Sequence, residues 1–187
     1  MKAYIMLSDG CEEVEALETA DILKRAGVET VLVSPFGAEI VTGSHGFRLV
    51  TDRQFASTDS YDAAAFGDAD AVVVPGGKLG TENNYKNAAL LEMLRAYNAA
   101  GRTVCAVCAG PTVLARAGIL DGHKATCYPG FEGGLAGAEF VGGPAVVSGN
   151  IITGKSLGCT VDFALAIVER LLGAEAARKV GQQIYRS

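Results

Sequence analysis

Short apolar runs that alternate with helical patterns constrain the fold of this chain more than any other feature. Each run has the length of a strand, is rich in β-branched residues and stops at a Gly, Pro or Ser cluster; the runs span 3–7, 28–34, 70–77 and 103–107. Each is mostly apolar without a strict alternation of polar residues, as parallel strands are when both faces of the sheet are covered. The alternation predicts an α/β fold, a mostly parallel sheet with helices on both faces.

The stretches between and after these runs have recognisable patterns of their own. Apolar residues recur at helical spacing in 11–27 and in 83–101, and both stretches end at a glycine. Residues 160–173 are apolar nearly all round, which predicts a well-buried helix. The stretches 39–52 and 141–153 break the rhythm and are typical of hairpins. No linker interrupts these elements, so we expect one domain over residues 1–187.

Charge and composition exclude several classes of function. The net charge is −5 and no Lys/Arg cluster stands out, which argues against nucleic acid as a partner. No segment reaches the roughly 18 apolar residues of a membrane span, and the apolar start of the chain is too brief for a signal peptide, so we expect a cytoplasmic protein. Five cysteines, an odd number, are expected to be thiols, and two histidines leave little material for a metal site. We expect neither a metal nor a cofactor.

Cys105 and Cys108 form a C-x-x-C pattern that has two interpretations. A redox pair needs Cα atoms within about 7 Å, whereas three residues of strand span about 10 Å and send the side chains to opposite faces. A zinc site needs a second ligand pair, and the sequence contains no other C-x-x-C. The redox-pair interpretation is therefore the weaker one. It stays open because the end of the strand is predicted only to within about 2–4 residues.

The alternative is a nucleophile at a sharp turn between a strand and a helix. Cys108 follows the strand directly, Ala109 and Gly110 permit a tight turn, and Pro111 suits the first helical position. At a helix N-terminus the thiolate is favoured, so this position predicts a lowered thiol pKa. Cys105 is then a core residue.

Two further groups lie at the ends of strands, where ligands bind in such sheets. Glu12 and Glu13 are expected to be solvated at a helix N-terminus, but Glu15 stands between apolar neighbours, so burial should raise its pKa and let it share a proton with a nearby sulfur. Gly76 and Gly77 follow a strand and could offer backbone N–H groups to an oxyanion. Neither a Walker motif nor a G-x-G-x-x-G follows a strand, which argues against nucleotide cofactors.

These pieces resemble the ThiJ/PfpI superfamily, and most closely its branch of Parkinson-disease-protein deglycases. The motifs that carry the resemblance run in order over nearly the whole chain: GCEEVEALETADILKRAG, AVVVPGG, AVCAGPTVLARAGILDGHKATCYPG and TVDFALAIVERLLG. The resemblance implies a flavodoxin-like three-layer sandwich, usually a homodimer with the first helix in the interface. Both are expectations for this chain.

The resemblance also implies roles for single residues. Cys108 is implied to be the oxidation-prone nucleophile and Glu15 the protonated acid hydrogen-bonded to it. The backbone donors beside the sulfur would come from a short set, Gly76, Gly77 and Ala109. Arg25 and His45 match positions at which that branch places basic residues near the partner subunit's site.

The chain departs from the superfamily at two positions. Tyr128 stands where the branch often has a His near the nucleophile, so proton transfer falls to Glu15, Tyr128 or water. Ala109 stands where the peptidase-like members have a His, so a Cys–His dyad is absent and peptidase or amidase activity is the weakest of the readings. We expect His123 to be an exposed turn residue.

The leading hypothesis is a cofactor-independent enzyme of the glyoxalase or deglycase type, acting on a small carbonyl substrate or a glycated protein. The alternative is a stress-response redox sensor or chaperone that signals through oxidation of Cys108. In a third possibility Cys11 or Cys127 acts as a resolving thiol. The sequence assigns no role to Cys159.

Overall fold

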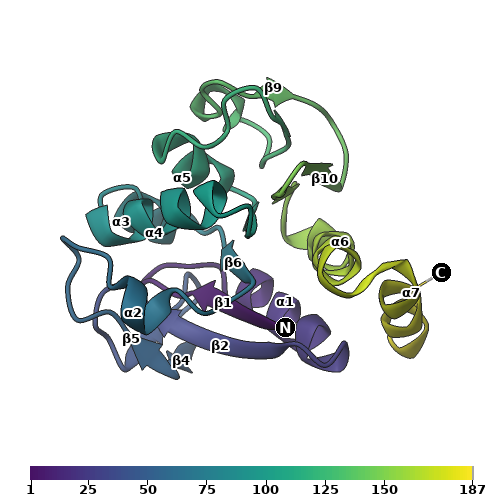
Figure 1. The fold of residues 1–187 in the computed structure, drawn as a ribbon, viewed down its shortest axis with the longest axis horizontal. Coiled ribbons are helices and arrows are strands. Elements are labelled where there is room, and N and C mark those ends of the chain that lie inside the picture. The colour runs from purple at the N-terminus through teal and green to yellow at the C-terminus, as the bar shows by residue number, and fades with distance from the viewer. Residues whose placement is uncertain (187) are drawn as a thin grey trace.

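A seven-stranded sheet forms the centre of the computed structural model, which describes residues 1–186 (Figure 1). Its strands are β1 (Lys2–Met6), β2 (Glu29–Ser34), β5 (Arg53–Gln54), β6 (Ala71–Val74), β7 (Thr103–Val107), β10 (Ala145–Ser148) and β11 (Ile151–Gly154). The order is β10-β11-β7-β6-β1-β2-β5, and each neighbouring pair is parallel except β10 with β11. The mostly parallel sheet predicted from the sequence is confirmed.

Helices cover both faces of this sheet. They are α1 (Glu13–Arg25), α2 (Ala63–Phe66), α3 (Lys78–Asn84), α4 (Ala88–Ala99), α5 (Pro111–Arg116), α6 (Thr160–Leu172) and α7 (Ala174–Gln183), with short 3₁₀ turns at Glu132–Gly134 and Leu157–Cys159. Among the described residues, no helix is both long enough and apolar enough to cross a membrane.

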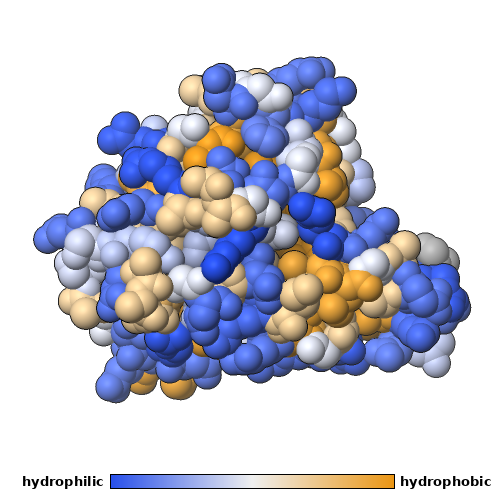
Figure 2. All heavy atoms as spheres, in the orientation of Figure 1, coloured by the Kyte–Doolittle hydropathy of each residue, from blue (hydrophilic) through white to orange (hydrophobic). Residues whose placement is uncertain are grey.

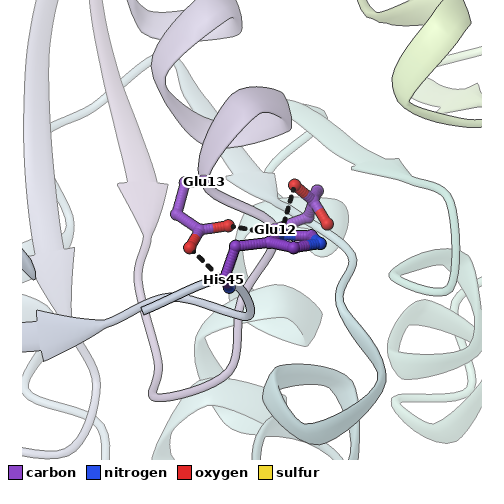
Figure 3. A group of neighbouring side chains, drawn as sticks. All are labelled: Glu12, Glu13 and His45. Atoms are coloured by element: carbon purple, nitrogen blue, oxygen red, sulfur yellow. Dashed lines mark hydrogen bonds and ion pairs between the residues drawn. The ribbon is translucent and has the colours of Figure 1, made fainter. Parts of the chain in front are cut away.

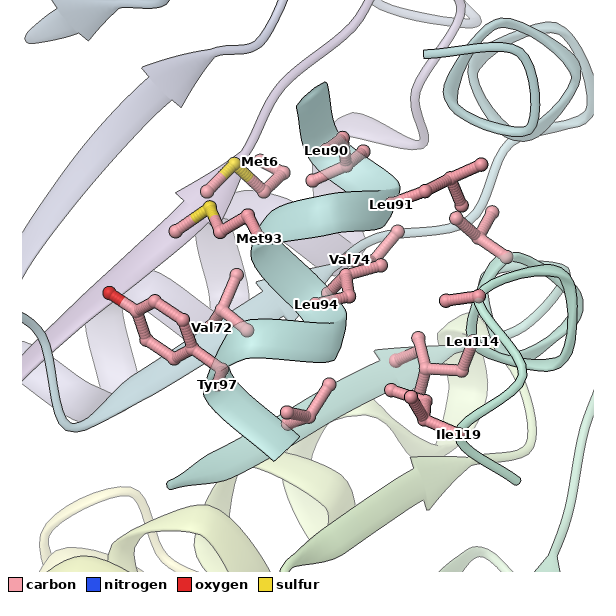
Figure 4. Packing of buried hydrophobic residues seen from close by; sticks show 14 of the residues in the cluster. Met6, Val72, Val74, Leu90, Leu91, Met93, Leu94, Tyr97, Leu114 and Ile119 are labelled. Atoms are coloured by element: carbon pink, nitrogen blue, oxygen red, sulfur yellow. The ribbon is translucent and has the colours of Figure 1, made fainter. Parts of the chain in front are cut away.

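Alternation along the strands divides the core into two layers. In β1, Tyr4 and Met6 point to the side covered by α4 and α5, while Ala3 and Ile5 point to the side covered by α1 and α6. Figure 4 shows the first layer, where the apolar face of α4 packs on β6. Because both faces are buried, the central strands need the continuous apolar runs seen in the sequence.

Both predicted hairpins are confirmed. β3 (Ile40–Thr42) and β4 (Arg48–Val50) pair antiparallel as a separate two-stranded sheet. β10 and β11 also form an antiparallel hairpin, and it joins the edge of the main sheet through β7. A second small sheet pairs β8 (Lys124–Ala125) with β9 (Glu139–Phe140) in parallel.

The predicted helix over 83–101 is wrong in its first turn. Residues 78–84 form a separate helix, α3, and α4 begins only at Ala88. The break has a local cause, because the Asn87 side chain accepts a hydrogen bond from Leu90 N at 2.9 Å and so caps α4.

The prediction that 160–173 is a well-buried helix is correct for the helix and wrong for its burial. One face of α6, with Phe163 and Ile167, is fully buried against the sheet, whereas Leu165 is half-buried and Leu172 is exposed. Hydrophobic residues accordingly reach the surface over α6 (Figure 2). The last helix, α7, packs against α6 but leaves this outer face partly open.

Candidate active site

Cys108 lies at a sharp turn between β7 and α5. Its φ is +63°, a left-handed conformation that non-glycine residues rarely adopt. The turn is held by two hydrogen bonds of its own backbone: its N–H donates to Gly154 O at 3.0 Å, and its carbonyl accepts from Tyr128 N at 2.9 Å. Pro111 then begins α5, as predicted. The geometry is that of a nucleophile elbow, in which the side chain is pushed out of the line of the strand.

Glu15 is buried in the first turns of α1. Its Oε2 accepts a hydrogen bond from Gly76 N at 2.8 Å, whereas Oε1 has no hydrogen-bond partner within residues 1–186. Burial penalises the ionised carboxylate and raises the pKa of Glu15 to about 7. The predicted upward shift has this physical cause, and it puts the group at the pKa of an acid–base catalyst near neutral pH.

Gly76 lies against both the Glu15 carboxyl group and the Cys108 side chain. A Cβ added at this position would lie 2.7 Å from Glu15 Oε2 and 3.1 Å from Cys108 Sγ. Any side chain at residue 76 would therefore push the carboxyl group and the sulfur apart. The glycine is required for their close approach.

The prediction of a lowered thiol pKa for Cys108 is wrong. Partial burial of the sulfur is the largest cause, and repulsion by the Glu15 carboxylate adds to it, so the thiol pKa rises to about 12. The backbone N–H groups of Ala109 and Gly77 act in the opposite direction but do not outweigh these effects. Between the two pKa values the pair holds one proton, and a thiolate forms when that proton resides on the carboxyl group.

The backbone N–H groups near Cys108 have different hydrogen-bond partners. The N–H of Gly76 is used by the Glu15 carboxylate, so the expectation that it donates to an oxyanion is corrected. The N–H groups of Gly77 and Ala109 remain as donors beside the sulfur. Gly77 has a φ of +87° and directly precedes α3 as its N-cap residue, and a Cβ there would collide with Gly10 O.

Tyr128 contacts the nucleophile residue through its backbone. Its N–H bonds the Cys108 carbonyl, while its side chain is 47 % exposed and packs edge-on against the ring of Phe131. The side chain is thus free to contact a bound molecule. Glu15 is the titratable group that touches the sulfur.

Glu13 corrects a further expectation, because it is buried rather than solvated. Figure 3 shows its carboxyl group beside His45 and Glu12. Burial alone would raise its pKa, but hydrogen bonds from its own backbone, from the backbone and ring of His45, and from Ser44 lower the pKa to about 2. His45 Nδ1 lies 3.2 Å from Glu13 and 3.6 Å from Glu12. The role of Ser44 could not be predicted from the sequence, because serines are common in turns and nothing in the neighbouring residues marks this one.

The ligand atoms of Glu12, Glu13 and His45 all lie within 4.8 Å of one another, a spacing that a metal ion could use. Both oxygens of Glu13 already accept hydrogen bonds from the hairpin. The group therefore fits a structural tie between α1 and the hairpin β3–β4.

The other predicted residues lie in different surroundings. Cys11 and Cys127 are buried, and burial raises the thiol pKa of each to about 11, which disfavours a resolving thiolate. Cys105 is fully buried, as expected for a core residue. Arg25 pairs with Asp21 at 2.6 Å near the far end of α1, about 15 Å from Glu15 at 1.5 Å per residue.

His123 and Cys159 lie outside this group of residues. His123 is only half-exposed, and its Nδ1 lies 3.0 Å from Ser148 O. The expectation that His123 is an exposed turn residue is therefore wrong. Cys159 stands at the start of α6 with a half-buried thiol.

Comparison with known proteins places this chain in a family. The model of the DJ-1/PfpI family matches residues 1–170. A Parkinson disease protein 7 homolog from Danio rerio is 35 % identical over 182 residues, covering 96 % of this chain and 94 % of the relative. A protein from Pyrococcus abyssi named a deglycase is 32 % identical over 157 residues, covering 83 % and 90 %.

Solved structures agree with these sequence relatives. DJ-1beta of Drosophila melanogaster superimposes with a TM-score of 0.92 at 31 % identity, covering 100 % of this chain and 98 % of its own. Oxidized DJ-1 of Toxoplasma gondii gives 0.91 at 32 % identity with the same coverage. This chain belongs to the DJ-1/PfpI family.

Proposed function

We propose that this chain is a cysteine-dependent enzyme that acts on small reactive dicarbonyls, such as glyoxal and methylglyoxal, or on their early adducts on proteins. The contact of Cys108 with Glu15 across Gly76 carries the proposal. It joins a nucleophile at a strained turn to a buried carboxyl group whose pKa is close to neutral pH. The deglycase name of the archaeal relative supports the same class of substrate.

In the proposed reaction the Cys108 sulfur adds to the aldehyde carbon of methylglyoxal and gives a hemithioacetal. The Glu15 carboxylate then takes the proton from this carbon and returns it to the neighbouring carbonyl carbon, which converts the hemithioacetal into a 2-hydroxyacyl thioester. Backbone N–H groups of Gly77 and Ala109 stabilise the negative oxygen. Water hydrolyses the thioester, releases lactate and restores the thiol.

The test is the formation of lactate from methylglyoxal by the purified protein. Wild type should form lactate, and Cys108→Ala should form none above the uncatalysed rate. Cys159→Ala is the matched control, because this half-buried thiol lies at the start of α6 and should be dispensable. Equal lactate formation by wild type and Cys108→Ala would contradict the proposal.

A redox role for Cys108 is the second candidate, and the burial of the cysteines favours it. Cys108 and Cys159 are half-buried, whereas Cys11, Cys105 and Cys127 are almost inaccessible. Of the two half-buried sulfurs, Cys108 has the backbone N–H groups of Gly77 and Ala109 beside it, and these donors would stabilise an oxidised, negatively charged sulfur. Mild peroxide should therefore oxidise Cys108 first. A stable gain of two oxygens on Cys108 in the intact mass, in a protein that makes no lactate, would favour the sensor over the enzyme. A disulfide lost in Cys11→Ser or Cys127→Ser would instead favour a resolving thiol.

A further inference from the structure

A pocket of about 270 Å³ lies beside the candidate active site. Its walls are one face of α3, with Lys78, Thr81, Glu82 and Tyr85 at i, i+3, i+4 and i+7, together with Lys86, Thr112 of α5 and Phe131. We name it the α3 pocket. Its size suits a small molecule of a few carbons rather than a cofactor.

Two of the residues that line the pocket are directly linked to residues whose N–H groups face the Cys108 sulfur. Lys78 directly follows Gly77, whose N–H faces the Cys108 sulfur. Thr112 donates its hydroxyl to the carbonyl of Ala109 at 2.8 Å, and the N–H of Ala109 also faces the sulfur. The backbone of residues 77–78 and 109–112 therefore joins the pocket to the surroundings of Cys108.

The charge of the pocket is opposite to that of the whole chain. Lys78 and Lys86 line it, and the guanidinium of Arg116 lies 5.2 Å from the ring centre of Tyr85 on its wall. None of these three cations forms an ion pair with the described residues. Lys78 and Lys86 against Glu82 give the lining an excess of one positive charge, and Arg116 adds a second beside it, in a protein whose net charge is −5.

The rest of the lining suits a short carbon chain with a polar group. Tyr85 and Phe131 provide apolar surface. Thr81 is 5 % exposed, and its hydroxyl oxygen has no hydrogen-bond partner in residues 1–186.

We propose that the α3 pocket binds the negatively charged tail of the carbonyl substrate, a carboxylate or another small anion. The preferred substrate is then a 2-oxoaldehyde that carries an acidic group a few carbons from the aldehyde. This inference rests on the proposed function for the identity of the reacting end, whereas the binding of an anion in the pocket can be tested without turnover.

The kinetic test compares methylglyoxal with 4,5-dioxopentanoate, which has the same reacting end and an added carboxylate. Lys78→Gln/Lys86→Gln should lower kcat/KM for 4,5-dioxopentanoate about tenfold and leave that for methylglyoxal unchanged, as expected for two exposed charges lost from one anion. Lys24→Gln, an exposed lysine of α1, is the matched control and should change neither value. An equal effect on the two substrates, or none, would overturn the proposal.

The binding test uses 4-oxopentanoate, which lacks the aldehyde, and inorganic phosphate as probes of the Cys108→Ser protein. Each probe that the pocket accepts should shift the NMR signals of Tyr85 and Phe131, and the double lysine variant should abolish the shifts. The uncharged methyl ester of 4-oxopentanoate should not bind.

The two tests separate the two proposals. Binding of either anion to Cys108→Ser at the α3 pocket, with no lactate from wild type, would refute the enzyme and keep the anion site. Lactate from wild type without binding of either anion would keep the enzyme and refute the site.

Discussion

Glu13 and Glu15 lie two residues apart in the first turn of α1, and the pKa values of their carboxyl groups are shifted in opposite directions. Glu13 is buried against four hydrogen-bond donors of its own backbone and the hairpin, which lower its pKa to about 2. Glu15 is buried with one backbone donor and an oxygen without a partner among the described residues, and its pKa rises to about 7. The number of donors around each carboxylate decides the sign.

The raised pKa of Glu15 makes stability depend on pH. The folded protein keeps a proton on Glu15 that the unfolded chain has lost between pH 4.5 and 7, so this group's contribution is present below that window and is lost as pH rises through it. Relative to Glu15→Gln, the wild-type free energy of unfolding should fall by about 3 kcal/mol across the window.

Urea denaturation of both proteins at pH 4 and pH 8 measures this difference. Glu82→Gln, which removes an exposed carboxyl group of α3, serves as the control. A difference between wild type and Glu15→Gln that is the same at both pH values would contradict the buried, protonated state of Glu15.

For single residues, the sequence predicts where a side chain lies in the fold better than it predicts which groups surround that side chain. Cys108 and Glu15 could be placed because each follows a strand whose apolar run is unmistakable. The burial of Glu13 could not be predicted, because it depends on a hairpin some thirty residues later that supplies Ser44 and His45. The raised thiol pKa depends first on burial of the sulfur and then on the approach of Glu15 across Gly76, and both are set by tertiary packing.

Among the elements, the break between α3 and α4 places the wall of the α3 pocket. Asn87 makes the break, because its Oδ1 caps α4 and its Nδ2 donates to Pro35 O at 2.7 Å. The spacing of apolar residues alone predicts one helix over 83–101, because it does not show this cap.

Asn87→Ala should lower the free energy of unfolding by about 2 kcal/mol, since it removes the cap and leaves the buried Pro35 carbonyl without its donor. Chemical denaturation with an unchanged m-value measures the loss. Asn83→Ala, which removes one exposed hydrogen bond to Asp9 O, should cost less than half as much. Equal losses in both variants would show that the cap at Asn87 has no special role.

The central strands were predictable because burial on both faces demands continuous apolar runs. α7 was not, because only Val180 and Gly181 of this helix are buried, too few to stand out in the sequence. α3 was missed because its glycine-rich start resembles a loop.

At the scale of the whole molecule, the exposed apolar residues of α1 support the expected homodimer. Val14 is 46 % and Leu17 is 42 % exposed, and at i and i+3 they share one face of the helix. We propose that a second copy covers this face. Wild type should then elute in size-exclusion chromatography with light scattering at twice the chain mass.

Val14→Lys/Leu17→Lys should be monomeric, because two charges would be buried in the interface. Leu172→Lys, at an exposed apolar residue of α6, is the control and should remain dimeric. A monomeric wild type, or a double variant that stays dimeric, would refute α1 as the interface.

The coupling of Cys108 to Glu15 is tested most directly by the rate of Cys108 alkylation as a function of pH, in wild type and in Glu15→Gln. Wild type should show a transition near pH 7, where the pair loses its first proton, and this transition should vanish in Glu15→Gln, whose Cys108 should titrate as a single group. One curve shared by both proteins, with a midpoint near the ordinary thiol value of about 8.5, would contradict the coupling and the proposed chemistry with it.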